Sequence, residues 1–195
     1  PGEPAGNALL LRRLNAAGRA RPLFWCANGA HEVQRLAEAL GPDRPLYALR
    51  SLQALVPPAA KPALEARLAA LYAEEIARLA GGLPLHLGGN CQSGRIAERL
   101  ATELEARGEA PAALHLLDHA PTRPHGGHVA LYFGAESPRF NPFLQAPAAA
   151  AEAGLRRLCR SVSWDVISGG HGEYFRPDRV AGLVGRLAAR MAEAE

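Results

Sequence analysis

The chain has 195 residues, of which 48% are hydrophobic and 21% charged, and its net charge is +3. This length and composition predict a single globular domain with a sizeable core. There is no apolar run of membrane-spanning length, no signal peptide and no arginine–aromatic pattern typical of nucleic-acid binding, so neither a membrane nor a nucleic acid is an expected partner. The three cysteines, Cys26, Cys91 and Cys159, lack metal-site spacing and predict reduced thiols in a cytoplasm.

Along the chain, residues 1–7 (P-G-E-P-A-G-N) are expected to be a linker joining residues 8–195, the folded domain, to a larger protein. Strands are predicted at residues 8–14, 21–26, 45–49, 83–88, 112–117, 128–133 and 163–168. Helical apolar stripes follow at residues 31–40, after residue 94, and from residue 180 onward, whereas the Pro/Ala-rich stretches 57–62 and 145–151 are loops or helix starts. Alternating strands and helices predict an α/β fold, a mostly parallel sheet with helices on both faces.

The segment with the most chemical information reads L-P-L-H-L-G-G-N-C-Q-S-G, at residues 83–94. An apolar strand ends in glycines and Cys91 precedes a helix, which is the layout of the nucleophile elbow of α/β-hydrolases. The backbone N–H of Gln92 would then stabilise an oxyanion, and the helix end is expected to lower the thiol pKa. The pattern therefore predicts acyl transfer through a thioester on Cys91.

Two other interpretations of this segment stay open. Most free cysteines are small buried hydrophobes, although the flanking strand and helix favour a nucleophile here. Ser93 is the rival nucleophile, disfavoured because it lies two residues past the turn and inside the helix. It also stands where the G-x-S-x-G pattern usually has its second glycine.

Catalytic partners are expected in the order nucleophile, acid, histidine. Asp118 follows the apolar run at 112–117, and His171 follows the one at 163–168. His171 would take the thiol proton, and Asp118 would orient the ring. Glu136, one strand later, is the alternative acid, and Asp165 is a weaker one because it falls inside an apolar run. Asp118 could also simply cap a turn, and His171 could be an ordinary loop histidine.

The segment P-H-G-G-H carries His125 and His128, with His119 nearby. These side chains lack cysteine or carboxylate partners at ligand spacing, so a polar loop is expected and no metal site.

Taken together, these motifs resemble the thioesterase domains of nonribosomal peptide and polyketide synthetases. The resemblance is carried by R-P-L-F-W-C-A-N-G-A, G-P-D-R-P-L-Y-A-L, the elbow, H-L-L-D-H-A-P and G-G-H-G-E-Y-F, in that order. It implies an α/β-hydrolase fold with Cys91, Asp118 and His171 as the triad. It also implies an acyl or peptidyl carrier protein as partner, with the substrate on its phosphopantetheine and no cofactor bound by this chain. The second oxyanion N–H would come from Ala27 or Asn28.

The chain departs from this family in two ways. The family mostly uses serine where this chain has Cys91. It also has a helical lid after the acid, where this chain has only T-R-P-H-G-G, so the lid is expected to be missing or minimal and Cys91 to lie in an open groove. A segment such as 137–151, with Phe140 and Phe143, could instead cover the site.

The predicted function is release of the acyl chain by water or another nucleophile. A cysteine acyl-enzyme is itself a thioester, so an acyl or aminoacyl shuttle between carrier thiols is an alternative, and a non-catalytic interaction domain is another.

Overall fold

The computed structural model describes residues 3–4, 10–80, 82 and 84–195. Its sheet has the order β1-β2-β4-β3-β5-β6-β7-β8. These strands are β1 (Glu3–Pro4), β2 (Arg12–Leu14), β3 (Leu23–Ala27), β4 (Leu46–Arg50), β5 (His86–Asn90), β6 (Ala113–Leu117), β7 (His125–Gly134) and β8 (Cys159–Ile167). Strands β3 to β8 pair in parallel, while β1 and β2 add an antiparallel edge. The predicted mostly parallel α/β sheet is confirmed.

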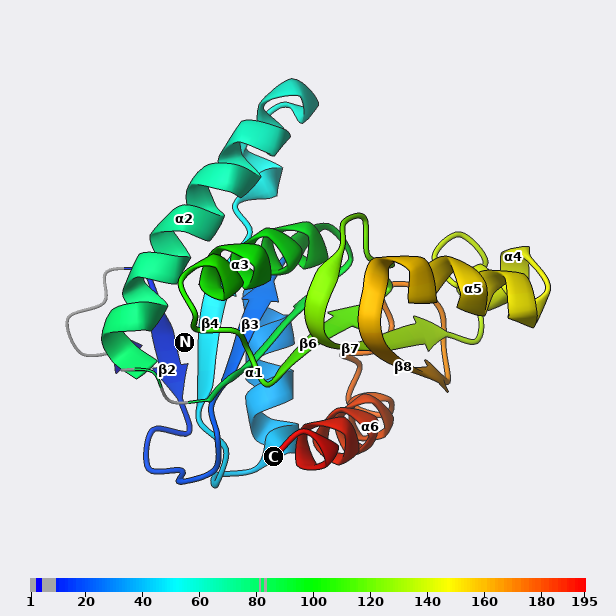
Figure 1. Ribbon diagram of the computed structural model, residues 1–195. Coiled ribbons are helices and arrows are strands. Elements are labelled where there is room, and N and C mark those ends of the chain that lie inside the picture. Colours follow the sequence, from blue (N-terminus) through cyan, green and yellow to red (C-terminus); the bar gives the residue numbers. More distant parts are fainter. Residues whose placement is uncertain (1–2, 5–9, 81, 83) are drawn as a thin grey trace.

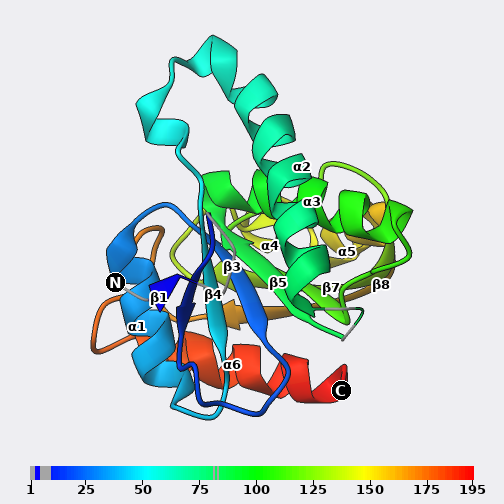
Figure 2. The ribbon, with the colours of Figure 1, turned by 90° about the vertical axis from the view of Figure 1, so that its left-hand side faces the viewer.

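Helices cover both faces of the sheet (Figures 1 and 2). On one face lie α1 (Ala30–Leu40) and α6 (Val180–Glu193), whose buried stripes join a core around Trp25 and Tyr132. On the other lie α2 (Lys61–Ala80) and α3 (Gly94–Ala106), which pack with α5 (Ala148–Leu158) over a second core. A short helix, α4 (Pro142–Gln145), precedes α5. No helix in the described ranges is long and apolar enough to cross a membrane.

Two sequence-based boundaries differ from the structure. Glu3–Pro4, inside the predicted linker, pairs with Arg12 and Arg13 as β1, whereas the other residues of 1–7 lie outside the described residues, as do residues 8 and 9 of the predicted first strand. The predicted polar loop around His125 and His128 is wrong, because β7 begins at His125 with a bulge before His128. Pairing with β8, which is distant in sequence, holds this glycine-rich segment extended.

The parallel strands place their carboxyl ends at one edge of the sheet. In an open α/β sheet, ligands bind at this edge. Strand β5 ends there at Asn90, followed by Cys91, and β6 ends at Leu117, followed by Asp118. Strand β8 ends at Ile167, and the loop to α6 carries His171. The three predicted triad residues therefore follow three strands of the same sheet edge.

Candidate active site

The elbow is a strained turn between β5 and α3. Cys91 opens a one-turn 3-10 helix, Cys91–Ser93, and its φ of +51° lies in the left-handed region that side chains other than glycine rarely occupy. Such a conformation costs on the order of 1–3 kcal/mol and persists only where the surroundings impose it. A Cβ added at Gly89 would lie 2.9 Å from the Ser93 carbonyl oxygen, and one at Gly94 would lie 2.8 Å from the His119 ring. Both flanking glycines are therefore required by close contacts.

Ser93 stabilises this turn through the hydrogen bonds of its side chain. Its hydroxyl oxygen lies 2.6 Å from the carbonyl oxygen of Cys26 and 2.8 Å from that of Asn90, and it accepts the Asn90 N–H at 3.1 Å. The side chain is fully buried. The hydroxyl connects the elbow to β3. Because it is buried and already hydrogen-bonded, it is poorly placed to act as the rival nucleophile.

The Asp118 carboxylate contacts the His171 ring and accepts hydrogen bonds from several other groups. The His171 Nδ1 atom lies 2.8 Å from Asp118 Oδ2, which also accepts hydrogen bonds from the hydroxyls of Tyr174, at 2.7 Å, and Ser137, at 3.2 Å. The Gly134 N–H donates to Asp118 Oδ1 at 3.3 Å. The carboxylate is buried and its φ is +47°, so the backbone is bent to present it.

Neither alternative acid reaches His171. Glu136 is exposed, and no hydrogen bond joins it to the ring in the described part of the chain. Asp165 on β8 pairs with Arg190 at 2.8 Å and Arg186 at 3.7 Å, on the α6 face. The geometry thus pairs the histidine with Asp118.

His171 lies in a glycine-containing loop with its ring partly exposed. Its side chain is 40% exposed, and its ring stacks on Phe140 with centroids 4.2 Å apart. The flanking Gly169 and Gly172 have φ values of +105° and +86°, which glycine adopts without strain. Among the described residues no hydrogen bond joins Cys91 Sγ to the ring, so the Asp118–His171 pair is formed without a bond to Cys91.

The expectation of a lowered thiol pKa at Cys91 is wrong. Burial raises the pKa of this thiol above its ordinary value, and the nearby charges of Asp118 and Glu32 raise it further. The Gln92 backbone N–H and Arg139 lower it, but do not outweigh burial. The resting side chain is therefore a thiol at neutral pH, and its reaction as a nucleophile needs a base.

The backbone N–H groups predicted to stabilise an oxyanion differ in whether they already have hydrogen-bond partners. The Gln92 N–H faces the Cys91 sulfur, where it stabilises the thiolate. The Asn28 N–H instead donates to Glu32 Oε2 at 3.3 Å, and the Asn28 side-chain amide donates to the Asn90 carbonyl at 2.8 Å. Ala27 is the last residue of β3, and its carbonyl accepts the Ser51 N–H. Asn28 therefore lies against the elbow, with its backbone donor engaged by a carboxylate.

Glu32 is a site residue that the sequence analysis missed. It lies buried in the first turn of α1, and its Oε1 accepts the Asn90 side-chain amide at 3.3 Å. Burial raises the pKa of this carboxyl to about 7, partly offset by its hydrogen bonds from Asn28 and Asn90. The only sequence signal was a glutamate following an Asn-Gly turn at a helix start, which is common in solvated helices.

A second buried carboxylate, Glu98 on α3, organises the histidines after β6. It accepts His119 Nε2 at 2.7 Å, His125 Nε2 at 3.2 Å and the Thr122 N–H at 2.7 Å. These bonds hold the pKa of Glu98 well below its ordinary value. No group of metal-ligating side chains that could hold an ion occurs within the described ranges.

A groove of about 350 Å³ adjoins Cys91. Its walls comprise Cys91, Gln92, Arg95, Asp118, His119, Ala120, Arg139, Phe140, Pro142 and Gln145. Segment 137–151 thus supplies one wall through Phe140 and α4, while Cys91 remains half-buried. Phe143 points elsewhere and packs on Phe133 and Trp164.

The sequence pattern of the thioesterase domain family matches residues 22–130, which include the elbow and Asp118. This chain belongs to the thioesterase domain family. Over 113 residues it is 34% identical to the chondramide synthase CmdD of Chondromyces crocatus, a match that spans 55% of the chain but only 3% of that synthase.

Solved thioesterases share the fold over almost the whole chain. The NocB thioesterase domain from the nocardicin cluster superposes with a TM-score of 0.74 at 16% identity, covering 94% of this chain and 99% of that one. YbtT, a type II thioesterase of the yersiniabactin pathway, gives 0.70 at 15% identity, with 95% and 99% covered. The surfactin thioesterase domain SrfTE gives 0.71 at 13% identity, with 93% and 95% covered. These similarities confirm the α/β-hydrolase fold of the thioesterase family.

Proposed function

We propose that this chain is a cysteine thioesterase of a peptide or polyketide assembly line. It takes an acyl or peptidyl chain from the phosphopantetheine thioester of a carrier protein and releases it by hydrolysis or attack of another nucleophile. The observation that carries the proposal is the Asp118–His171 pair at 2.8 Å, beside a strained elbow that presents Cys91. The family membership supports the reaction class, and the resemblance to a segment of a synthase supports the assembly-line context.

In the first step His171 takes the Cys91 proton, and the thiolate attacks the thioester carbonyl carbon. A Cys91 C–S bond forms and the carbonyl electron pair moves to oxygen, where the Gln92 N–H stabilises it. The carbon–sulfur bond to the pantetheine arm then breaks, and the leaving thiolate takes the proton from the imidazolium. Asp118 keeps Nδ1 protonated and stabilises the charged ring.

In the second step the acyl group leaves Cys91. Water gives a proton to His171 and attacks the acyl carbon. Collapse of the intermediate breaks the Cys91 C–S bond, and the proton returns to sulfur. The products are one free acid and one carrier thiol for each thioester and water consumed. No resident cofactor takes part, because phosphopantetheine enters as part of the substrate.

The half-buried Cys91 and the helix-free link at residues 119–124 support a reduced lid. In this proposal, α4 and Phe140 supply the wall that the family's lid would otherwise form. Water then reaches the acyl-enzyme readily, which favours hydrolysis.

A shuttle between two carrier thiols is the second candidate, favoured by one observation: the nucleophile position holds Cys91. Transfer from one thioester to another is nearly neutral in energy, so a cysteine suits reversible exchange. A non-catalytic interaction domain is the third, and it does not account for the assembled Asp118–His171 pair.

The fate of the acyl group separates these candidates. The protein is mixed with an acyl-loaded carrier, and a second, empty carrier of different mass is added. Free acid, with the second carrier unloaded, is the expected result. Loading of the second carrier at the expense of free acid would replace release by the shuttle, and an unchanged first carrier would leave only the interaction domain.

A further inference from the structure

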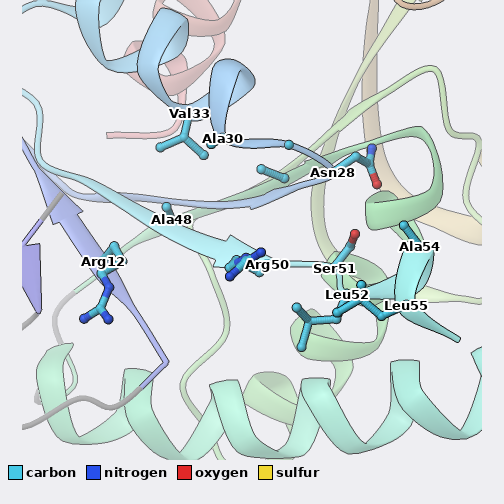
Figure 3. Close-up of a pocket in the computed structure, with 12 residues that line it drawn as sticks. Arg12, Asn28, Ala30, Val33, Ala48, Arg50, Ser51, Leu52, Ala54 and Leu55 are labelled. Atoms are coloured by element: carbon cyan, nitrogen blue, oxygen red, sulfur yellow. The ribbon is translucent and has the colours of Figure 1, made fainter. Parts of the chain in front are cut away.

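A cavity of about 390 Å³, separate from the Cys91 groove, lies between α1 and the segment after β4 (Figure 3). Its size is that of a small-molecule pocket. The walls are mostly apolar, with Ala30 and Val33 from α1 on one side and Leu52 and Leu55 on the other. The proposed catalytic steps make no use of this cavity.

Two exposed arginines line this cavity, Arg12 from β2 and Arg50 from the end of β4 (Figure 3). In the antiparallel pairing Arg12 lies opposite Ala48, and Arg50 is two residues further along the same face. Such diagonal neighbours are about 7–8 Å apart, so both side chains can reach one anion. Neither guanidinium has a hydrogen-bond or ion-pair partner in the described part of the chain, and no carboxylate lines the cavity.

The cavity is linked to the elbow through Asn28. Ala27, Asn28 and Gly29 line it, and the Asn28 side-chain amide donates to the carbonyl of Asn90, the residue before Cys91. Gln53, which lies in the chain between the lining residues Leu52 and Ala54, donates from Nε2 to the carbonyl of Gln92 at 2.9 Å. Residues on both sides of the nucleophile are thus hydrogen-bonded to segments that form the cavity.

The direction of the substrate follows from the proton that the leaving thiol must receive. His171 supplies that proton, so the pantetheine arm lies on the side of His171 and Phe140, along the Cys91 groove. An acyl chain bound in this direction would extend from the carbonyl carbon to the other side, toward Asn28 and the cavity that Arg12 and Arg50 line.

We infer that this cavity binds an acyl chain carrying a second, free carboxylate, which pairs with Arg12 and Arg50 while its thioester carbon lies at Cys91. The inference rests on the proposed function and names its substrate class: dicarboxylic or acidic acyl thioesters. Guanidinium groups pair with carboxylates through paired, charge-assisted hydrogen bonds, and an uncharged chain of the same shape lacks this interaction.

The test compares two N-acetylcysteamine thioesters of equal shape, adipyl and its terminal amide, adipamoyl. We expect the wild type to show a kcat/KM at least about tenfold higher for adipyl, the discrimination that a charge-assisted pair supplies. In the double variant Arg12→Gln/Arg50→Gln this ratio should fall toward one. The matched control Arg157→Gln/Arg160→Gln removes two exposed charges elsewhere and should keep the wild-type ratio. Equal turnover of both thioesters by the wild type would overturn the inference.

Two further arms make the result specific. In the first, kcat/KM is compared for adipamoyl pantetheine and adipamoyl 4′-phosphopantetheine. If the phosphorylated thioester is preferred and Arg12→Gln/Arg50→Gln removes that preference, the two arginines bind the phosphate of the arm and the inference is wrong. Adipate is titrated against adipamate by NMR, which needs no catalysis. Binding of adipate alone, lost in Arg12→Gln/Arg50→Gln, supports the site even if no thioester is turned over. If the protein turns over thioesters but neither binds adipate nor prefers the adipyl thioester, the proposed function stands and this inference is wrong.

Discussion

The His171 ring and the Asp118 carboxylate lie 2.8 Å apart although 53 residues separate them in the chain. We predict that His171→Ala lowers kcat/KM about a thousandfold or more, since the thiol of Cys91 then has no base to deprotonate it. Asp118→Asn should cost less, because a thiol depends less than a hydroxyl on full base activation. Steady-state kinetics on one acyl thioester measures both, with circular dichroism to check folding.

Glu136→Gln is the matched control for the acid. Its carboxylate is exposed and has no hydrogen bond to the ring among the described residues, so activity should stay within about twofold of the wild type. A large loss in Glu136→Gln with little loss in Asp118→Asn would move the acid one strand later.

Cys91 should be the fastest-reacting thiol among the three cysteines. Burial raises the pKa of the Cys26 thiol strongly and that of Cys159 to about 11, and both side chains are buried. Cys91 is half-buried at the edge of a groove. Limiting iodoacetamide followed by peptide mapping checks this, and preferential labelling of Cys159 would contradict the elbow assignment.

Much of this site was predictable because its signals are local. Two glycines around a cysteine between an apolar run and a helical stripe predicted the turn at Cys91, and apolar runs predicted the strands before Asp118 and His171. The fold class followed from the same alternation.

What escaped prediction depends on contacts between distant segments. The start of β7 at His125 depends on β8 and on Glu98, more than 25 residues away in sequence. The role of Glu32 depends on its burial beneath Asn28 and Asn90, which periodicity does not reveal. The pKa of Cys91 was mispredicted for the same reason, since burial outweighs the helix end.

Glu32 should make Cys91 reactivity depend on pH near neutrality. Its pKa is raised to about 7, so above that pH its charge opposes a thiolate and its carboxylate holds the Asn28 N–H. Glu32→Gln removes the charge and keeps an acceptor, so Cys91 alkylation at pH 8 should be severalfold faster than in the wild type, and the two rates should converge at pH 6. Identical rates of alkylation at both pH values would show that Glu32 has no influence on the thiol.

The buried histidines should make the fold sensitive to acid. Burial and Arg44 lower the pKa of His86 to about 4, and burial lowers that of His115, which lies 3.3 Å from His86. The unfolded chain binds these protons near pH 6.5, so stability is present above pH 6.5 and is lost as pH falls toward 4. Each such group contributes about 1.4 kcal/mol per pH unit in that window.

Urea unfolding between pH 7 and 4.5 measures this loss. Glu32 opposes it, because a carboxyl with a raised pKa in the folded state favours folding more strongly as pH falls from 7 to 4.5. The comparison is therefore made in the Glu32→Gln background, with and without His86→Gln. The variant that keeps His86 should have the steeper slope; parallel slopes would mean that His86 is protonated in the folded state.

Intact mass spectrometry of the protein, quenched during turnover of an acyl-loaded carrier, tests most directly whether the acyl chain passes through a thioester on Cys91. We predict a mass increase equal to one acyl group, located by peptide mapping on Cys91 and released by hydroxylamine, with neither adduct nor turnover in Cys91→Ala. Turnover that persists in Cys91→Ala, or an acyl group found on Ser93, would contradict a thioester intermediate on Cys91.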